Sequence, residues 1–354
     1  METDLERISL TLSEPLATAG GLIDQRELML VCLTGEHGMI GWGEAAPLEP
    51  YDGVSDKRCS DALAKQLAAI ESAPRGATGA VLLEAARSAD PLPQALAAID
   101  TALWDLAGQR EGKPLASLLA AEPLARVPVN AVIGADDPEA AASAARASVA
   151  AGFTTLKVKV GTPTDVERLE AIRVAIGPEV AIRIDANGAW SVAQALEALE
   201  ALEPFGIEFA EEPVSGIAQF EELKGRTAIA IAIDESCDEP GALASAAADL
   251  VCLKLSRAGG VSGLLAQAAV VRASGAEPYV ASTLDGAVGI EDGLEQHPRR
   301  LLPQAGKIRA HRLAHVVEPM AAGALRHEDL TAPHRVSLGL RRHGILRHDH
   351  AAVA

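Results

Sequence analysis

The chain has 354 residues, 49% of them apolar, and a mean hydropathy of +0.15, so it can bury a large core and is not a disordered polymer. Its formal net charge of −18 disfavours a nucleic-acid partner, because binding to phosphates depends on basic surface. No apolar run reaches membrane-spanning length, no export signal opens the chain, and the four cysteines lack a metal-binding spacing, so we predict a cytoplasmic protein without a membrane partner.

Residues 1–125 are predicted to form a separate α+β domain. Two β-rich stretches, ISLTLSEPL (8–16) and LMLVCLTGEHGMIGWGEAAPL (28–48), predict an antiparallel meander. Ala- and Leu-rich segments follow and end in ALAAIDTALWDLAGQREGKPLASLL (95–119), whose apolar spacing predicts helices.

From residue 126 the chain alternates regularly between short strands and helices. The period of roughly 20–27 residues is typical of βαβ units and of a parallel sheet. Seven consecutive units favour a closed β/α barrel over an open doubly wound sheet, and no GxGxxG motif follows the first strand. We assign residues 126–320 to the barrel and 321–354 to an atypical tail. The predicted strands are 127–134, 155–161, 180–188, 207–213, 229–236, 250–256 and 277–283.

Polar side chains stand at the downstream ends of these strands, where the reactive face of a β/α barrel is built. Asp185, Glu211 and Asp234 are separated by 26 and 23 residues, one βα unit each, so three carboxylates converge. A single acid of this kind is as often a helix cap or a surface ion pair, but three at matched strand ends favour a hard divalent ion. We predict Mg²⁺, which Mn²⁺ could replace. The other polar residues at these ends are Lys157, Lys159, Arg183, Asn187, Glu235 and Lys254.

The stretch TTLKVKVG (154–161) places two lysines on one face of a strand, because side chains alternate along it. On a surface strand, Lys157 and Lys159 would face solvent or pair with carboxylates. In a barrel mouth, beside a metal and opposite Lys254, a lysine loses its proton more easily and can act as a base. The predicted chemistry is removal of a proton next to a carboxylate, with the metal stabilising the resulting enediolate.

The motifs KVKVG, RIDANGAW, FAEEP, IAIDES and LKLSRAGG, in this order, resemble the enolase superfamily in its muconate-lactonizing subgroup. GWGEAAPL and AIDTALWDLAGQREGKPLASLL look like the capping domain of that superfamily and the helix leading into its barrel. The resemblance implies a modified (β/α) barrel with an N-terminal α+β capping domain. It also implies that the three carboxylates hold Mg²⁺ and that Lys159 and Lys254 form an acid/base pair, with Lys157 as an electrostatic neighbour.

Within the subgroup, VPVNAVIG, RID (183–185) and YVASTLDGAVGI are most similar to the o-succinylbenzoate synthases of the actinobacterial type. That resemblance implies syn-dehydration of 2-succinyl-6-hydroxy-2,4-cyclohexadiene-1-carboxylate to 2-succinylbenzoate in menaquinone biosynthesis. Lys159 would take the α-proton and assist the departure of hydroxide, while Lys254 would stay protonated and support the anionic intermediate.

The same resemblance assigns substrate contacts. Arg183 would add positive charge near the site, and Ser282 and Thr283 would hold the succinyl tail. The loops 18–24 and 47–53 would close over the substrate. Asn187 and Glu235, which adjoin the metal ligands, are expected to support them.

The sequence bears differently on the alternative functions. A mandelate-racemase-like enzyme needs a histidine on the seventh strand, which EPYVAST lacks, and a dipeptide epimerase is expected to carry an Asp-x-Asp pair near the eighth strand, which is not found. N-acylamino acid racemase activity uses the same two lysines and stays open, as does the less favoured muconate cycloisomerisation. A binding protein that has kept the barrel would leave the lysines and acids idle.

The segment after residue 290 departs from the family pattern. Residues 291–354 hold 10 of the 31 Lys and Arg residues and 7 of the 49 Asp and Glu residues. AHVVEPM (314–320) is the best candidate for an eighth strand, so we expect imperfect barrel closure and impaired stability or activity. His311/His315 and His348/His350 are expected to be surface groups rather than a second metal site. The sequence allows a monomer or a homo-oligomer.

Overall fold

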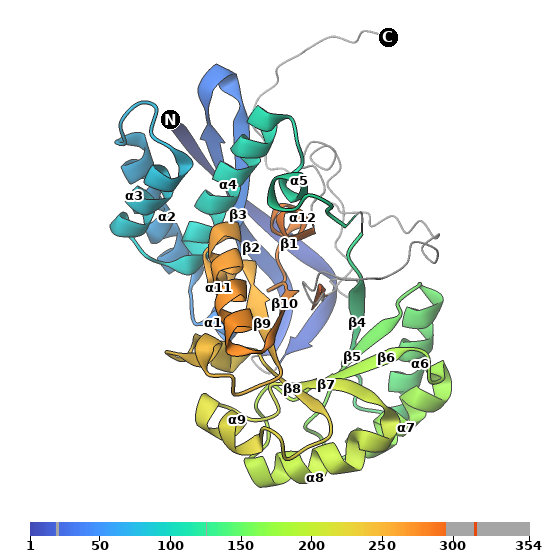
Figure 1. Ribbon diagram of the computed structural model, residues 1–354. Coiled ribbons are helices and arrows are strands. Elements are labelled where there is room, and N and C mark those ends of the chain that lie inside the picture. The colour runs from blue at the N-terminus through green and yellow to red at the C-terminus, as the bar shows by residue number, and fades with distance from the viewer. Residues whose placement is uncertain (19–20, 125, 295–314, 317–354) are drawn as a thin grey trace.

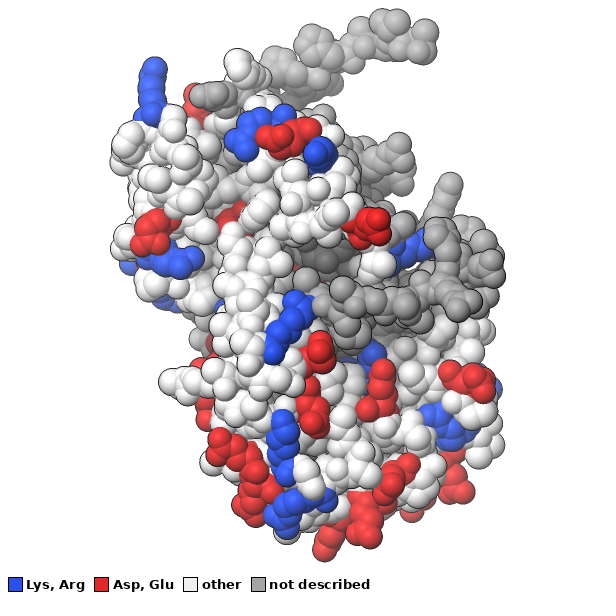
Figure 2. All heavy atoms as spheres, in the orientation of Figure 1, with Lys and Arg blue, Asp and Glu red and all other residues white. Residues whose placement is uncertain are grey.

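The computed structural model describes residues 1–18, 21–124, 126–294 and 315–316 (Figure 1). None of the helices in this described part combines the length and the hydropathy of a membrane-spanning helix. On the face shown in Figure 2, acidic and basic side chains are scattered in small groups, with acidic ones the more frequent over the barrel helices in the lower part of the view. This distribution follows the negative net charge of the chain.

The N-terminal domain is an antiparallel sheet covered by helices. Its strands pair in the order β1-β2-β3, with β1 and β2 forming one long hairpin. Residues 21–24 of the predicted closing loop therefore lie in β2. The elements are β1 (Glu2–Thr18), β2 (Gly21–Thr34), η1 (Glu36–Gly38), β3 (Ile40–Ala45), α1 (Glu49–Asp52), α2 (Asp56–Glu71), α3 (Gly79–Ala89), α4 (Pro93–Glu111) and α5 (Leu115–Leu119).

Helix α4 packs directly on strand β3, and two glycines make that approach possible. A Cβ atom at Gly43 would lie 1.9 Å from the carbonyl oxygen of Ala98, and one at Gly41 would lie 2.2 Å from that of Ala102. Only glycine fits at either position. The motif GWG therefore sets the distance between the sheet and the helix that leads into the barrel.

The second domain is a curled parallel sheet of seven strands with helices on its outer side, as predicted (Figure 1). Its strands are β4 (Val129–Ile133), β5 (Thr155–Lys159), β6 (Ala181–Asp185), β7 (Ile207–Glu211), β8 (Ala230–Ile233), β9 (Leu250–Lys254) and β10 (Glu277–Ala281). Its helices are α6 (Pro138–Ala150), α7 (Asp165–Ile176), α8 (Val192–Leu202), η2 (Glu203–Phe205), α9 (Ile217–Leu223), η3 (Glu235–Asp238), η4 (Ala242–Ala244), α10 (Leu255–Ala258), α11 (Val261–Ser274) and α12 (Ala287–Leu294).

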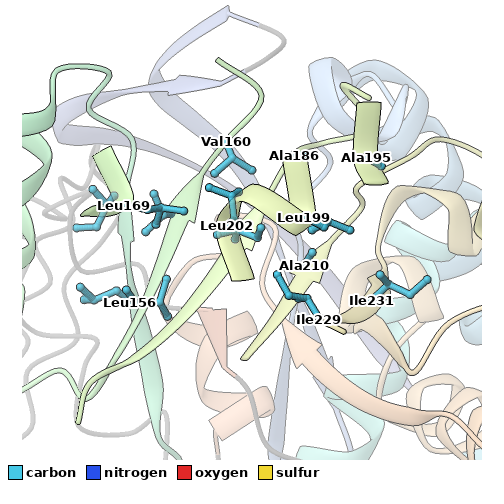
Figure 3. Packing of buried hydrophobic residues seen from close by; sticks show 14 of the residues in the cluster. Leu156, Val160, Leu169, Ala186, Ala195, Leu199, Leu202, Ala210, Ile229 and Ile231 are labelled. Carbon is cyan, nitrogen blue, oxygen red and sulfur yellow. The ribbon is translucent and has the colours of Figure 1, made fainter. Parts of the chain in front are cut away.

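An apolar layer between this sheet and helices α6–α9 forms the largest core. Leu156 and Ile231 on the strands pack in one cluster with Leu169 and Leu199 on the helices, and all four are almost fully buried (Figure 3). Ile184 on β6 is buried in the same cluster. Strands β4–β8 thus send one set of side chains outward into this core, and β9 sends its outward set into a smaller cluster against α11. The alternate set points into the barrel, where the charged residues lie.

The predicted eighth strand is only partly seen. Within AHVVEPM, His315–Val316 form β11, which pairs antiparallel with β4 rather than continuing the parallel sheet. Among the described residues β11 lies against β10 without forming a strand pair with it, so the hydrogen-bonded sheet does not close there. The rest of that motif and the predicted tail 321–354 lie outside the described residues. So do His311, His348 and His350. The domain boundary at residue 125 stays a prediction.

Candidate active site

Three buried carboxylates stand at the ends of neighbouring strands. Asp185 is the last residue of β6, Glu211 is the last of β7, and Asp234 directly follows β8. Parallel pairing places Asp185 opposite Glu211, and Lys159 opposite Asp185. The three acids are at most 3% exposed. The three acids thus lie at the ends of adjacent strands, and that they share one metal ion stays a prediction.

Lys157 lies between two of these acids. Its Nζ is 2.8 Å from Oδ2 of Asp185 and 2.6 Å from Oε1 of Glu211. Burial opposes its charge, but the attraction of Asp185, Glu211 and Asp234 outweighs burial and raises the pKa of Lys157. One cation already bridges two of the predicted metal ligands, so Lys157 is an electrostatic partner of the acids and remains charged.

Lys159 lies nearer to solvent on the same strand face. Its side chain is 38% exposed, and its Nζ is 2.6 Å from Oδ2 of Asp185 and 2.8 Å from Oδ1 of Asn187. Asn187 adopts a left-handed backbone conformation, with φ of 46°, and also donates to Glu235 at 2.9 Å. Asn187 and Glu235 thus lie beside the site, and Asn187 orients the amine of Lys159.

A second network holds the backbone of Lys159. The guanidinium of Arg168, 1% exposed, donates to the carbonyl oxygen of Lys159 at 2.6 Å and to Asp165 at 2.9 Å. Asp165 in turn accepts from the backbone N–H groups of Gly161 and Thr162 at 2.7 and 3.0 Å. Arg168 and Asp165 therefore hold the backbone of Lys159 and of the loop that follows β5.

Lys254 faces the acids from the other side of the mouth. It ends β9, is 5% exposed, and its Nζ lies 2.5 and 2.6 Å from the two carboxylate oxygens of Asp234. The same ammonium lies 4.3 Å from the centre of the Tyr51 ring, a cation–π contact. Burial works against its charge, but the attraction of Asp234 prevails and the pKa of Lys254 is raised well above its usual value.

The sequence did not single out Tyr51 and Arg257, yet both belong to this cluster. The predicted loop 47–53 contains the short helix α1, and from it Tyr51 reaches Oδ1 of Asp234 at 3.1 Å. Arg257, three residues after Lys254, donates to the Tyr51 hydroxyl at 2.9 Å. The capping domain therefore contacts the barrel acids directly. One helical turn separates Arg257 from Lys254, which is the only local signal that could have found it.

Glu212 was also missed, although it adjoins a predicted ligand. It has a φ of 40° and accepts hydrogen bonds from the backbone N–H groups of Asp234 at 2.7 Å and Ser236 at 3.0 Å. Burial raises the pKa of Glu212 to about 8. The second glutamate of the pair Glu211-Glu212 thus turns away from the mouth and holds the loop that carries Asp234.

The donor set fits a hard divalent cation. Burial raises the pKa of Glu211 to about 7, and the charges of Asp185 and Asp234 add to that effect, so a bound cation would relieve their mutual repulsion. The ligand atoms of Glu211, Asp234 and Cys252 lie within 4.8 Å of one another. Burial raises the pKa of the Cys252 thiol far above its usual value, and a neutral thiol is a poor ligand for a hard ion. Carboxylate oxygens are the suitable donors.

The remaining predicted residues lie around this centre. Arg183 is inside the barrel, one layer below Asp185, where it donates to Glu208 at 2.6 Å and its guanidinium carbon lies 4.9 Å from the centre of the Phe209 ring. Ser282 follows β10, and the hydroxyl of the buried Thr283 is already bonded within the protein. Their roles toward a substrate stay predictions.

Comparison with known proteins identifies the family of this chain. Residues 3–120 match the N-terminal domain family of mandelate racemase and muconate lactonizing enzyme, and residues 139–297 match the enolase C-terminal domain-like family. The chain is 31% identical to the L-Ala-D/L-Glu epimerase of Bacillus subtilis (strain 168) over 307 residues, which is 81% of each chain. The chain belongs to the enolase superfamily. It is therefore a member of a superfamily of enzymes.

Other members of the enolase superfamily are similar to the chain to different extents. A structure of the dipeptide epimerase of Enterococcus faecalis V583, complexed with Mg and L-Leu-L-Tyr, has a TM-score of 0.76 at 25% identity and covers 90% of this chain and 97% of that one. The o-succinylbenzoate synthase of Mycobacterium bovis is 40% identical, but over 183 residues, which is 48% of this chain and 52% of that protein. The match to this o-succinylbenzoate synthase thus has a higher identity than the match to the L-Ala-D/L-Glu epimerase, but it extends over fewer residues.

Proposed function

We propose that the protein is an o-succinylbenzoate synthase that needs a divalent cation, Mg²⁺ in the first place. The dehydration removes the α-proton of 2-succinyl-6-hydroxy-2,4-cyclohexadiene-1-carboxylate and expels its hydroxyl group, so that the ring becomes aromatic. The observation that carries the proposal is the unequal setting of Lys159 and Lys254 around the carboxylates. The identity with o-succinylbenzoate synthases, 40% over about half of each chain, adds to it.

Asp185, Glu211 and Asp234 would hold the metal. A bound divalent cation would supply positive charge to the substrate carboxylate and lower the barrier to loss of the neighbouring proton. Lys159, which now binds Asp185, and Lys254, which now binds Asp234, would then be released from those contacts. Lys157, shared between Asp185 and Glu211, would keep the net charge of the acids low.

Lys159 is the proposed base. As a neutral amine it takes the α-proton, and the electron pair of the broken C–H bond passes into the substrate carboxylate as an enediolate. That electron pair then forms the new ring double bond as the C–O bond breaks. The ammonium formed on Lys159 gives its proton to the departing hydroxide, and water leaves. The exposed position of its amine, 38% exposed and oriented by Asn187, suits a group that must meet the substrate.

Lys254 is the proposed electrostatic partner. Its ammonium lies against the Tyr51 ring and beside Asp234, two contacts that favour the cation over the neutral amine. A lysine kept protonated can stabilise negative charge that develops on the substrate, but it cannot take a second proton. This asymmetry favours a reaction with one base, such as dehydration.

A second candidate is racemisation of an N-acylamino acid or epimerisation of a dipeptide. The observation in its favour is that two amines reach the carboxylate cluster from different strands, Lys159 on β5 through Asp185 and Lys254 on β9 through Asp234, as a two-base proton transfer needs. The L-Ala-D/L-Glu epimerase of Bacillus subtilis matches over 81% of the chain. The absence of an Asp-x-Asp pair from the sequence weighs against a dipeptide substrate.

An assay of the purified chain with Mg²⁺ separates these reactions. We expect loss of the cyclohexadiene acid and formation of 2-succinylbenzoate, with N-succinyl amino acids and dipeptides racemised more slowly. Racemisation or epimerisation faster than dehydration would contradict the proposal and favour the second candidate. Absence of both activities, with Mg²⁺ bound, would reject an enzymatic role for the paired lysines.

A further inference from the structure

A buried arginine joins the capping domain to the barrel beside the mouth. Arg26 on β2 is 5% exposed, and its guanidinium donates to four backbone carbonyl oxygens. Two belong to the capping domain, Pro47 at 2.7 Å and Ala46 at 3.0 Å. The other two follow strand β10 of the barrel, Leu284 at 3.2 Å and Thr283 at 3.4 Å.

Each pair of carbonyls belongs to a segment that leads to the site. Ala46 and Pro47 precede helix α1, whose Tyr51 touches Asp234 and Lys254. On the barrel side, the Thr283 hydroxyl lies 2.9 Å from that of Ser256, which is two residues after Lys254. Arg26 thus joins two segments beside the site, which we call the two walls: residues 46–53 of the capping domain and residues 283–290 after β10.

Two buried acids hold the same barrel turn, and the charge of Asp285 is the stronger of the two in favouring the buried guanidinium. Asp285 accepts from the backbone N–H of Thr283 at 3.0 Å and from its hydroxyl at 2.9 Å. Glu44 on β3 accepts from the backbone N–H groups of Gly286 at 2.5 Å and Gly289 at 3.2 Å. Because the carbonyls accept every bond from Arg26 and the acids accept from N–H groups, the turn is held from both sides.

We propose that Arg26 is a positioning residue that sets the spacing between the two walls of the substrate pocket, and with it the substrate tail that the site accepts. The inference rests on the proposed function, in which Ser282 and Thr283 line the wall toward the succinyl tail. A planar guanidinium can reach four acceptors in fixed directions, whereas an ammonium on a flexible stem cannot. Arg26→Lys therefore keeps the charge and removes the geometry.

The chain offers a matched control in Arg173 on α7. Its guanidinium also donates to four carbonyls, those of Phe205, Gly177, Val180 and Gly206, at 2.9, 2.8, 2.8 and 3.2 Å. These carbonyls precede β6 and β7, at the end of the sheet opposite to the site. Arg173→Lys makes the same chemical change without touching either pocket wall.

The first readout does not depend on any activity. Backbone hydrogen exchange should accelerate in Arg26→Lys at both 46–53 and 283–290, and in Arg173→Lys at neither. Acceleration confined to one segment, or equal in the two variants, would overturn the proposal. The result stands even where the wild type fails to dehydrate the cyclohexadiene acid, so the two failures are distinguishable.

The second readout is kinetic. In Arg26→Lys we expect KM for the cyclohexadiene acid to rise about tenfold, the factor for loss of one charge-assisted hydrogen bond, with kcat nearly unchanged. Arg173→Lys should keep the wild-type KM. If Arg26→Lys does not fold, Asp285→Asn, which weakens the hold on Thr283, should show a smaller rise of the same kind. A wild-type KM in a folded variant would contradict the assignment.

Discussion

At the scale of single residues, two lysines on one strand face have different surroundings. Lys157 is buried between Asp185 and Glu211, whereas the amine of Lys159 is partly exposed and bonds to Asp185 and Asn187. Like charges on one face normally repel, but here carboxylates separate and neutralise them. The buried lysine therefore balances the acids, and the outer one is free to meet a substrate.

Replacement of Lys159 tests that division of roles. In Lys159→Ala we expect kcat to fall by about a thousandfold, the effect of removing a positioned base, while Tm stays near the wild-type value because Lys157 still neutralises Asp185. Steady-state kinetics and thermal melting measure both. Lys57→Ala, at an exposed site on α2, is the control and should change neither. Retained turnover in Lys159→Ala would exclude it as the base.

At the scale of elements, the loop after β5 is held by a buried ion pair. Arg168→Met would leave Asp165 without its cation and the Lys159 carbonyl without its donor. We expect the free energy of unfolding to fall by about 3 kcal/mol, the usual loss on breaking a buried pair. We also expect kcat to fall more than KM changes, because the amine is displaced. Arg146→Met on α6, an exposed pair with Glu139, is the control. An unchanged kcat would show that the loop does not position Lys159.

Glu44, which accepts hydrogen bonds from backbone N–H groups at the start of α12, makes the stability of the fold depend on pH. Burial raises the pKa of Glu44 to about 7, and the nearby charge of Asp285 adds to it. The folded state then holds this proton more tightly than the unfolded state, so ionisation destabilises the fold as pH rises from about 4.5 to about 7. Stability from this group is complete below that window and lost above it.

Glu44→Gln removes that dependence. We expect the wild type to lose stability relative to Glu44→Gln between pH 4.5 and 7, and the difference to be constant at higher pH. Chemical denaturation at several pH values measures it, and the other buried acids cancel because both proteins contain them. Parallel stability profiles would contradict the assignment.

At the scale of the whole molecule, polar contacts join the two domains. In one of them, a residue of the capping domain accepts hydrogen bonds at the N-terminus of helix α11 in the barrel. Asp100 on α4 is 2% exposed and accepts from the backbone N–H and the hydroxyl of Ser262, both at 2.7 Å, at the start of α11. Asp100→Ala removes the acceptor of both partly buried donors of Ser262. We expect a loss of about 2 kcal/mol in the free energy of unfolding.

Denaturant unfolding checks this loss. Asp61→Ala, which removes an exposed carboxylate on α2, is the matched control and should leave the free energy of unfolding nearly unchanged. An equal effect in the two variants would mean that the contact between α4 and α11 does not stabilise the protein.

The fold was predictable because its signals are local. The alternation of strands and helices predicted the parallel sheet. The spacing of Asp185, Glu211 and Asp234 predicted that they lie at the ends of neighbouring strands. Tyr51 escaped because its contact with Asp234 spans 183 residues, and no local pattern reports a partner so distant. The predicted eighth strand was the least secure, since a two-residue antiparallel pairing leaves no periodicity to detect.

The central claim is that three buried carboxylates share one divalent ion, and a titration with Mn²⁺ followed by electron paramagnetic resonance tests it directly. We predict one bound Mn²⁺ per chain that Mg²⁺ displaces, and an affinity at least about tenfold weaker in Glu211→Gln, which removes one charged ligand. Lys159→Ala should bind the ion as well as the wild type. No binding by the wild type, or equal binding by Glu211→Gln, would contradict the account.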